Sequence, residues 1–246
     1  MLSEMRALLS KELRQARRSR GALISTTVLS LLLIVVTPMG QLAGLRASGG
    51  RLPSGLGGGL PASLIGDDPL ALFGAVLLPL FVTMAGLLVP SVAAVHTVVV
   101  ERERRSVELL IALPVRVRDI LVAKLLATLA LTSAVLVPLL LFDLLILLYL
   151  AIVTPVQALA MLAVLFAAEL CSIALALLVA LLAGDFRTAN NLNGVTIGPA
   201  LLLVSAVLFG APAQLRIPLL VLLLLSVAVV AVVIALRWLT FERYLA

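Results

Sequence analysis

The chain has 246 residues, of which 63% are hydrophobic and only 12% are charged, and its mean hydropathy is +1.27. A water-soluble domain has about 45–50% apolar and about 25% charged residues. The composition therefore excludes a soluble enzyme or binding module and predicts an all-α polytopic membrane protein. The net charge of +6 does not indicate a nucleic-acid partner, because the basic residues form no binding face with the ten aromatic residues of the whole chain (Phe 7, Tyr 2, Trp 1).

Residues 1–20 are predicted to form an amphipathic helix. Apolar side chains recur at helical spacing on one face, at Leu2, Met5, Leu9, Leu13 and Ala16. Basic side chains occupy the opposite arc, at Arg6, Lys11, Arg14, Arg17 and Arg18. This pattern is typical of a helix that lies in the interface of the lipid bilayer, with its basic face toward anionic head groups.

Six apolar segments follow, each long enough to cross a bilayer, for which about 20 residues suffice. They are predicted at residues 22–39, 69–100, 120–150, 155–183, 191–209 and 217–239. The second and third are about 30 residues long, so we expect part of each to project beyond the bilayer. The glycine-rich stretch 40–66 between the first two spans is expected to be a flexible linker.

The distribution of Lys and Arg predicts the orientation, because cytoplasmic segments carry an excess of these residues. If the N-terminus is cytoplasmic, the outer segments contain only Arg46, Arg51 and Arg216. The inner segments contain fifteen: Arg6, Lys11, Arg14, Arg17, Arg18, Arg20, Arg102, Arg104, Arg105, Arg116, Arg118, Lys124, Arg187, Arg237 and Arg243. We therefore expect a multi-pass protein of the cytoplasmic (inner) membrane with both termini in the cytoplasm.

Residues 101–119 form the longest charged run and lie between the second and third spans. In a helix, Glu101 and Arg105 are four residues apart, as are Arg104 and Glu108, and each such pair contributes a few tenths of a kcal/mol. The charged residues thus share one face of a predicted cytoplasmic helix. Such a helix can serve as a docking surface for a soluble partner, and it can equally be a solvated loop between two spans.

The other face of the same segment is apolar and carries Leu109, Leu110 and Leu113. Pro114 cannot donate a backbone hydrogen bond, so the helix is expected to end or kink there. Asp119 is a good N-cap residue and is predicted to begin the third span.

Two carboxylates lie inside predicted spans, Asp143 in the third and Glu169 in the fourth. A charged group at this depth costs about 2.5–3.5 kcal/mol on insertion scales, so each is expected to face a cavity or a partner group. One interpretation is a substrate or proton path. The other is a neutral, hydrogen-bonded carboxyl, or one close to the membrane interface. His96, the single histidine, has no Cys, Asp or Glu at ligand spacing, so no metal site is predicted.

Prolines also occur within the predicted spans, at positions 79, 90, 138 and 199. They can act as hinges for alternating access. Proline is, however, more frequent in membrane helices than in soluble ones, so the residue type alone does not decide between a hinge and a structural role.

The order of these elements resembles the ABC-2 type permease family. A basic amphipathic helix and two spans precede the segment ERERRSVELLIALPV, which begins at Glu101, and DILVAK, which begins at Asp119, opens the third span. The resemblance in topology covers the whole chain, whereas the motif covers about 25 residues.

The resemblance implies that residues 101–119 form a coupling helix that contacts an ATPase. The coupling residues would then be Glu101, Arg104, Arg105, Glu108, Leu109, Leu110 and Pro114. It also implies that the N-terminal helix is the elbow of the subunit, and that two six-span subunits, identical or paralogous, pair around an export path. The chain has no GxxxxGK[ST] sequence, so ATP is expected on a separate ATP-binding cassette subunit, and no cofactor is expected in this chain.

Two other function classes are compatible with a polytopic membrane protein. An intramembrane enzyme would have to use Asp143, Glu169 or His96, but no two of these are three or four residues apart, and neither GxSxG nor HExxH occurs. No catalytic residue is therefore assigned. A membrane scaffold or assembly subunit that does not itself transport remains the alternative to an export permease.

Overall fold

The computed structural model describes residues 20–47, 69–103, 117–183 and 186–238. These residues contain six helices that are long and apolar enough to cross a membrane, and no strand occurs among them. The predicted all-α, six-span fold is thus confirmed. The predicted interfacial helix over residues 1–20 falls almost wholly outside the described residues.

The six spans follow the chain order, and the first two are built from several segments each. Span one consists of α2 (Arg20–Leu31), η1 (Leu32–Val36) and α3 (Thr37–Ala47), and span two of α5 (Pro69–Leu72), η2 (Phe73–Leu77) and α6 (Leu78–Glu103). Spans three to six are single helices, namely α8 (Val117–Tyr149), α9 (Pro155–Leu182), α10 (Phe186–Gly210) and α11 (Arg216–Trp238). The segments η1 and η2 are single π-helical turns within otherwise α-helical spans.

Two predicted boundaries differ from the observed ones. The linker was expected to start at Gly40, but α3 continues to Ala47, because burial of Leu42 and Leu45 gives its outer turns a packed face. Asp119 was expected to cap the third span, but α8 begins at Val117 and Asp119 lies within its first turn. Both differences extend a helix beyond its apolar segment.

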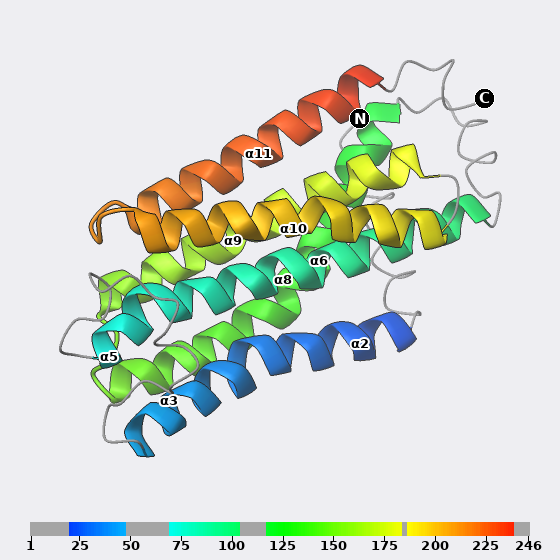
Figure 1. Cartoon of the computed structure of the whole chain (residues 1–246). Helices are drawn as coiled ribbons and strands as arrows, with labels where there is room; N and C mark the ends of the chain where they lie inside the picture. The colour runs from blue at the N-terminus through cyan, green and yellow to red at the C-terminus, as the bar shows by residue number, and fades with distance from the viewer. Residues whose placement is uncertain (1–19, 48–68, 104–116, 184–185, 239–246) are drawn as a thin grey trace.

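The helices run side by side, and their ends define two ends of the bundle (Figure 1). The connections α8–α9 and α10–α11, the last turn of α3 and the short α5 lie at one end, here called the hairpin end. The start of α2, the last turn of α6 and the end of α11 lie at the opposite end, here called the terminus end. The terminus end corresponds to the predicted cytoplasmic side, and that orientation remains a prediction.

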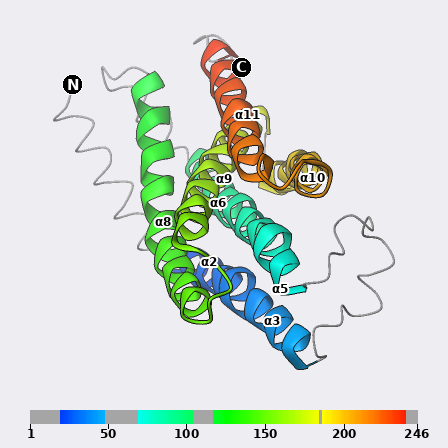
Figure 2. The ribbon, with the colours of Figure 1, turned by 90° about the vertical axis from the view of Figure 1, so that its left-hand side faces the viewer.

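Helices α6 and α9 lie at the centre, with α8, α2–α3, α10 and α11 around them (Figure 2). In the most apolar 18-residue window of span two and of span four, 67% of the residues are buried, against 22% in span six. Helix α9 packs against α6, α11, α8 and α10. The central pair is therefore covered by protein, and the outer helices present apolar surface to lipid.

The two central helices approach each other closely at Gly86 of α6. A Cβ atom at this position would lie 2.7 Å from the Cβ of Ala168 and 3.2 Å from the carbonyl oxygen of Leu165, so only glycine fits. One turn further along α9, the hydroxyl of Ser172 donates a hydrogen bond to the carbonyl oxygen of Leu87. Close approach at small residues and hydrogen bonds between helices are the forces that hold helices together in lipid. We call this contact the α6–α9 seam.

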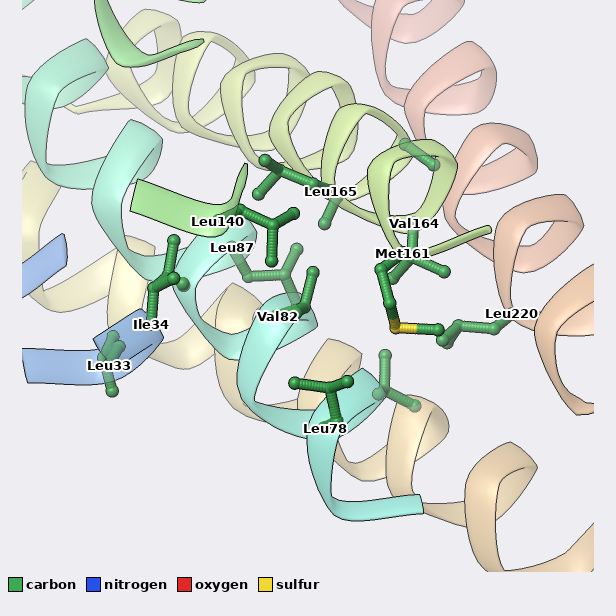
Figure 3. Packing of buried hydrophobic residues seen from close by; sticks show 14 of the residues in the cluster. Leu33, Ile34, Leu78, Val82, Leu87, Leu140, Met161, Val164, Leu165 and Leu220 are labelled. Carbon is green, nitrogen blue, oxygen red and sulfur yellow. The ribbon is translucent and has the colours of Figure 1, made fainter. Parts of the chain in front are cut away.

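The apolar core extends from the seam toward the hairpin end (Figure 3). Its largest fully buried side chains include Leu78 and Leu87 of α6, Met161 and Leu165 of α9, and Leu140 of α8. Ile34 of η1 and Leu220 of α11 complete the core from either side, since both are buried in the same cluster.

The connection between α8 and α9 is fixed by caps on both helices. At the end of α8, the amide of Ile152 donates to the carbonyl oxygen of Leu147, and the amide of Ala151 donates to that of Leu148. Ala151 has a φ of 53°, as expected at the left-handed position of this type of C-cap. Helix α9 begins with a capping box, in which the side chains of Thr154 and Gln157 each bond to the backbone of the other.

Candidate translocation path and coupling segment

Glu169 lies in the middle of α9 and is fully buried. The hydroxyl of Ser133 on α8 donates a hydrogen bond to its Oε2 atom. Its Oε1 atom has no hydrogen-bond partner among the residues that the structure describes. The carboxyl group therefore joins α8 to α9 through one oxygen, while the other oxygen is buried without a hydrogen-bond partner in the described part of the chain.

In the terminus-end half of α8, the side of the helix that faces the bundle interior carries polar residues. Lys124, Thr128 and Thr132 follow one another at four-residue spacing, and all three are buried. The hydroxyl of Thr132 donates to the carbonyl oxygen of Thr128 at 3.0 Å. Polar side chains thus extend along the interior side of α8 up to the level of Ser133 and Glu169.

Asp143 lies nearer the hairpin end on the same helix, where the buried positions are otherwise leucines. Its side chain is fully buried, and neither carboxylate oxygen has a hydrogen-bond partner within the described part of the chain. Ten residues separate it from Ser133, which corresponds to about 15 Å along a helix axis. The structure therefore places the two predicted path residues at different depths and does not bring them together.

Several polar residues that the sequence analysis did not single out also lie in the interior, among them Ser172 and Asn193, and Ser133 is half-buried beside Glu169. Ser133 and Ser172 each make a hydrogen bond between α9 and a neighbouring helix, and Asn193 of α10 is buried with its Oδ1 atom unpartnered among the described residues. The sequence feature that could have indicated these residues is a serine or an asparagine inside an apolar span. It is weak, because such residues are usual in membrane helices, where the hydroxyl often bonds to its own backbone.

The polar side chains named above form hydrogen bonds within and between helices of the bundle. Among the described residues, no group of three or more His, Cys, Asp and Glu side chains could hold a metal ion. Isolated carboxyl groups in a low-dielectric interior are costly when charged, so they require a partner, a proton or a ligand. Glu169 has such a partner in Ser133, and Asp143 has none in this part of the chain.

The predicted coupling residues lie mostly outside the described residues. Glu101 belongs to the last turn of α6, at the terminus end. Arg104, Arg105, Glu108, Leu109, Leu110 and Pro114 fall within residues 104–116, which are not described. The two helices that flank this segment, α6 and α8, have 26 and 33 residues, and both contact α9.

The profile of a family described as "ABC-2 type transporter" matches residues 3–209. This range includes the first four spans, all of α10 except its last residue, and the whole charged segment between α6 and α8. No curated protein and no solved structure was found to match the chain.

Proposed function

Because the chain belongs to the ABC-2 type transporter family, we propose that it is the permease subunit of an ATP-driven exporter and forms the path of an unidentified substrate. The observation that carries this proposal is the family match over residues 3–209 together with six helices that can cross a membrane. The family match supports a transporter subunit, and the resemblance of residues 101–119 to a coupling helix supports export driven by ATP.

The proposed energy source is a separate ATP-binding cassette subunit that contacts residues 101–119. The acidic and basic residues Glu101, Arg104, Arg105 and Glu108 form the polar face of the contact, Leu109 and Leu110 form its apolar face, and Pro114 ends it. A push on this segment would reach α6 directly, since Glu101 is in its last turn. Helix α6 is held against α9 at the seam, so the two central helices would move together.

A second copy of the chain, or a paralogue, is proposed to complete the path. The outer helices of the single chain carry large exposed apolar side chains, among them Leu222 and Val229 of α11 and Val195 and Leu202 of α10. Such faces are suited to the bilayer or to another membrane subunit. The terminus end is assigned to the cytoplasm, on the basis of the fifteen Lys and Arg residues predicted on that side.

Glu169 and Asp143 are proposed as residues of the translocation path. Buried ionisable groups within a membrane are expensive to maintain, which favours a role for each. Ser133 would position the Glu169 carboxyl, and the unpartnered oxygens of both residues would be the atoms available to a substrate.

The proposal is tested by purifying the tagged chain from its native membrane in mild detergent. We expect a protein with a Walker motif to copurify in a near-equal molar amount, and we expect Glu108→Arg to remove it. The matched control is Arg51→Glu, which also changes a charge by two but lies in the linker that is predicted to be on the opposite side. A chain that never brings an ATPase with it would contradict the export permease and favour the scaffold alternative.

A further inference from the structure

The first two spans contain the same local construction. In span one the π turn Leu32–Val36 is followed by Pro38, and in span two the π turn Phe73–Leu77 is followed by Pro79. In both, the proline is the second residue after the π turn. Pro90, Pro138 and Pro199 also lie inside membrane helices, but these helices remain α-helical around them.

A proline in a helix lacks the N–H group of the regular bond, and its ring collides with the carbonyl group four residues earlier. A π turn before the proline widens the helix by one residue and moves that carbonyl group away. In span one both the amide and the hydroxyl of Thr37 donate to the carbonyl oxygen of Leu32, the hydroxyl at 2.7 Å. In span two the amide of Leu78 donates to Phe73 in the same way. Prolines and π turns are both recognised causes of sharp helix bends.

The segments beyond the two π turns lie at the hairpin end and contact each other. We call α3 and α5 the arms, and α3 contacts both α5 and α6. The arm α3 buries Leu42 and Leu45 on one side. On its other side, a Cβ atom added at Gly40 or Gly44 would meet no atom within 4 Å in the described structure. One side of this arm thus has room to move.

The part of span two on the terminus side of η2 is held much more tightly. It includes Gly86, where the α6–α9 seam leaves no room for even a methyl group, and Leu87, whose carbonyl oxygen accepts the bond from Ser172. Span two therefore contains a tightly packed segment on one side of η2 and, on the other side, the short arm α5, in which Ala71 is exposed and Leu72 is buried.

We propose that the two proline-terminated π turns are paired hinges, about which the arms α3 and α5 bend together relative to the α6–α9 seam. The hinge itself involves no other subunit, because both π turns and both arms belong to this chain. Its role, to open and close the hairpin end of the translocation path, rests on the proposed permease function. A bend of about 20° in an arm of roughly ten residues displaces its end by roughly 5 Å.

The test uses the full chain in lipid nanodiscs and distances between pairs of spin labels. Cys171 is the only cysteine and is buried, so a Cys171→Ala background accepts labels at chosen positions. One label pair reports on the arm, with cysteines at the exposed positions Ala43 and Leu215. The reference pair reports on the terminus-end half, at the exposed positions Val28 and Val233.

In the parent we expect a broad distance distribution for the arm pair and a narrow one for the reference pair. Pro38→Ala should narrow the arm distribution and shift its mean by roughly 5 Å, with the reference pair unchanged. Pro138→Ala is the matched control, because Pro138 has no π turn, and it should leave both pairs as in the parent.

The hinge is overturned if Pro38→Ala leaves the arm distribution unchanged, or if Pro138→Ala shifts it as much. Should Pro38→Ala fail to fold, Pro79→Ala tests the second hinge, with a label at the exposed Ala71 of α5 in place of Ala43. The distribution should narrow in the same way, with a shift of roughly 2 Å, because Ala71 lies only about four residues from the middle of η2. These distances need no ATPase. If the distances confirm the hinge but no ATPase copurifies with the chain, the hinge stands and its role in export is refuted.

Discussion

The α6–α9 seam and the arm α3 use the same residue type in opposite ways. At the seam, Gly86 permits an approach so close that a Cβ atom would lie 2.7 Å from Ala168. In the arm, Gly40 and Gly44 have open space around them. Glycine in a membrane helix therefore marks close packing at the seam and a lack of packing in the arm. Only the position of the neighbouring helix distinguishes the two cases. The difference suggests a fixed centre with movable segments at the hairpin end.

The largest expected effect comes from filling the seam. Gly86→Leu should prevent α6 and α9 from approaching, and the cost should reach about 3 kcal/mol or more, because overpacking at a helix contact forces backbone shifts. Thermal unfolding of the purified chain in detergent measures this. Gly44→Leu is the matched control in the arm, and we expect its unfolding temperature to stay near that of the parent. Equal losses for both variants would show that the two regions do not differ.

Glu169→Ala should have the next largest effect. The substitution leaves the Ser133 hydroxyl without its interhelical acceptor and opens a cavity beside a fully buried position, at a cost of about 2–3 kcal/mol. Glu169→Gln keeps an acceptor of similar size and should retain most of the stability. If the two variants unfold at the same temperature, the bond to Ser133 is not what holds this part of α8 against α9.

Removing the cap of α9 should have an intermediate effect at the hairpin end. Thr154→Ala deletes the side-chain oxygen that accepts from the amide of Gln157, and such a loss costs about 1 kcal/mol. Hydrogen exchange of the first turn of α9 should increase, while exchange around the seam should not. An increase of the same size at both places would mean that the bundle opens as one unit.

The smallest measurable effect is expected for the seam hydrogen bond. Ser172→Ala removes the bond to the carbonyl oxygen of Leu87 and should cost roughly 0.6 kcal/mol, the average for hydrogen bonds between membrane helices. Ser226→Ala on α11 is the control, because this exposed hydroxyl bonds only to Leu223 of its own helix. We expect Ser172→Ala to lower the unfolding temperature and Ser226→Ala to leave it unchanged. A fall for both variants would show that the hydrogen bond at the seam has no special role.

The sequence predicted the elements of the fold better than their contacts. Runs of about 20 apolar residues identify spans from composition alone, and the start of α9 at Pro155 followed from the local sequence. The extension of α3 to Ala47 was missed, because it depends on the burial of Leu42 and Leu45 by other spans.

The candidate site was predictable only in part, for the same reason. Glu169 and Asp143 stand out in the sequence as carboxylates among apolar residues. Their surroundings do not, because Ser133 lies 36 residues from Glu169 in the chain, and nothing local indicates that the two side chains meet. The π turns before Pro38 and Pro79 were likewise not predictable, since Pro90, Pro138 and Pro199 occur in similar apolar sequence without them.

The permease account is tested most directly by ATP hydrolysis of the complex that is purified through this chain from its native membrane and placed in nanodiscs. We expect steady hydrolysis that is lost when Glu108→Arg breaks the contact with the ATPase and that persists in the Arg51→Glu control. Preparations that contain no ATPase, or hydrolysis that is equal in both variants, would contradict it.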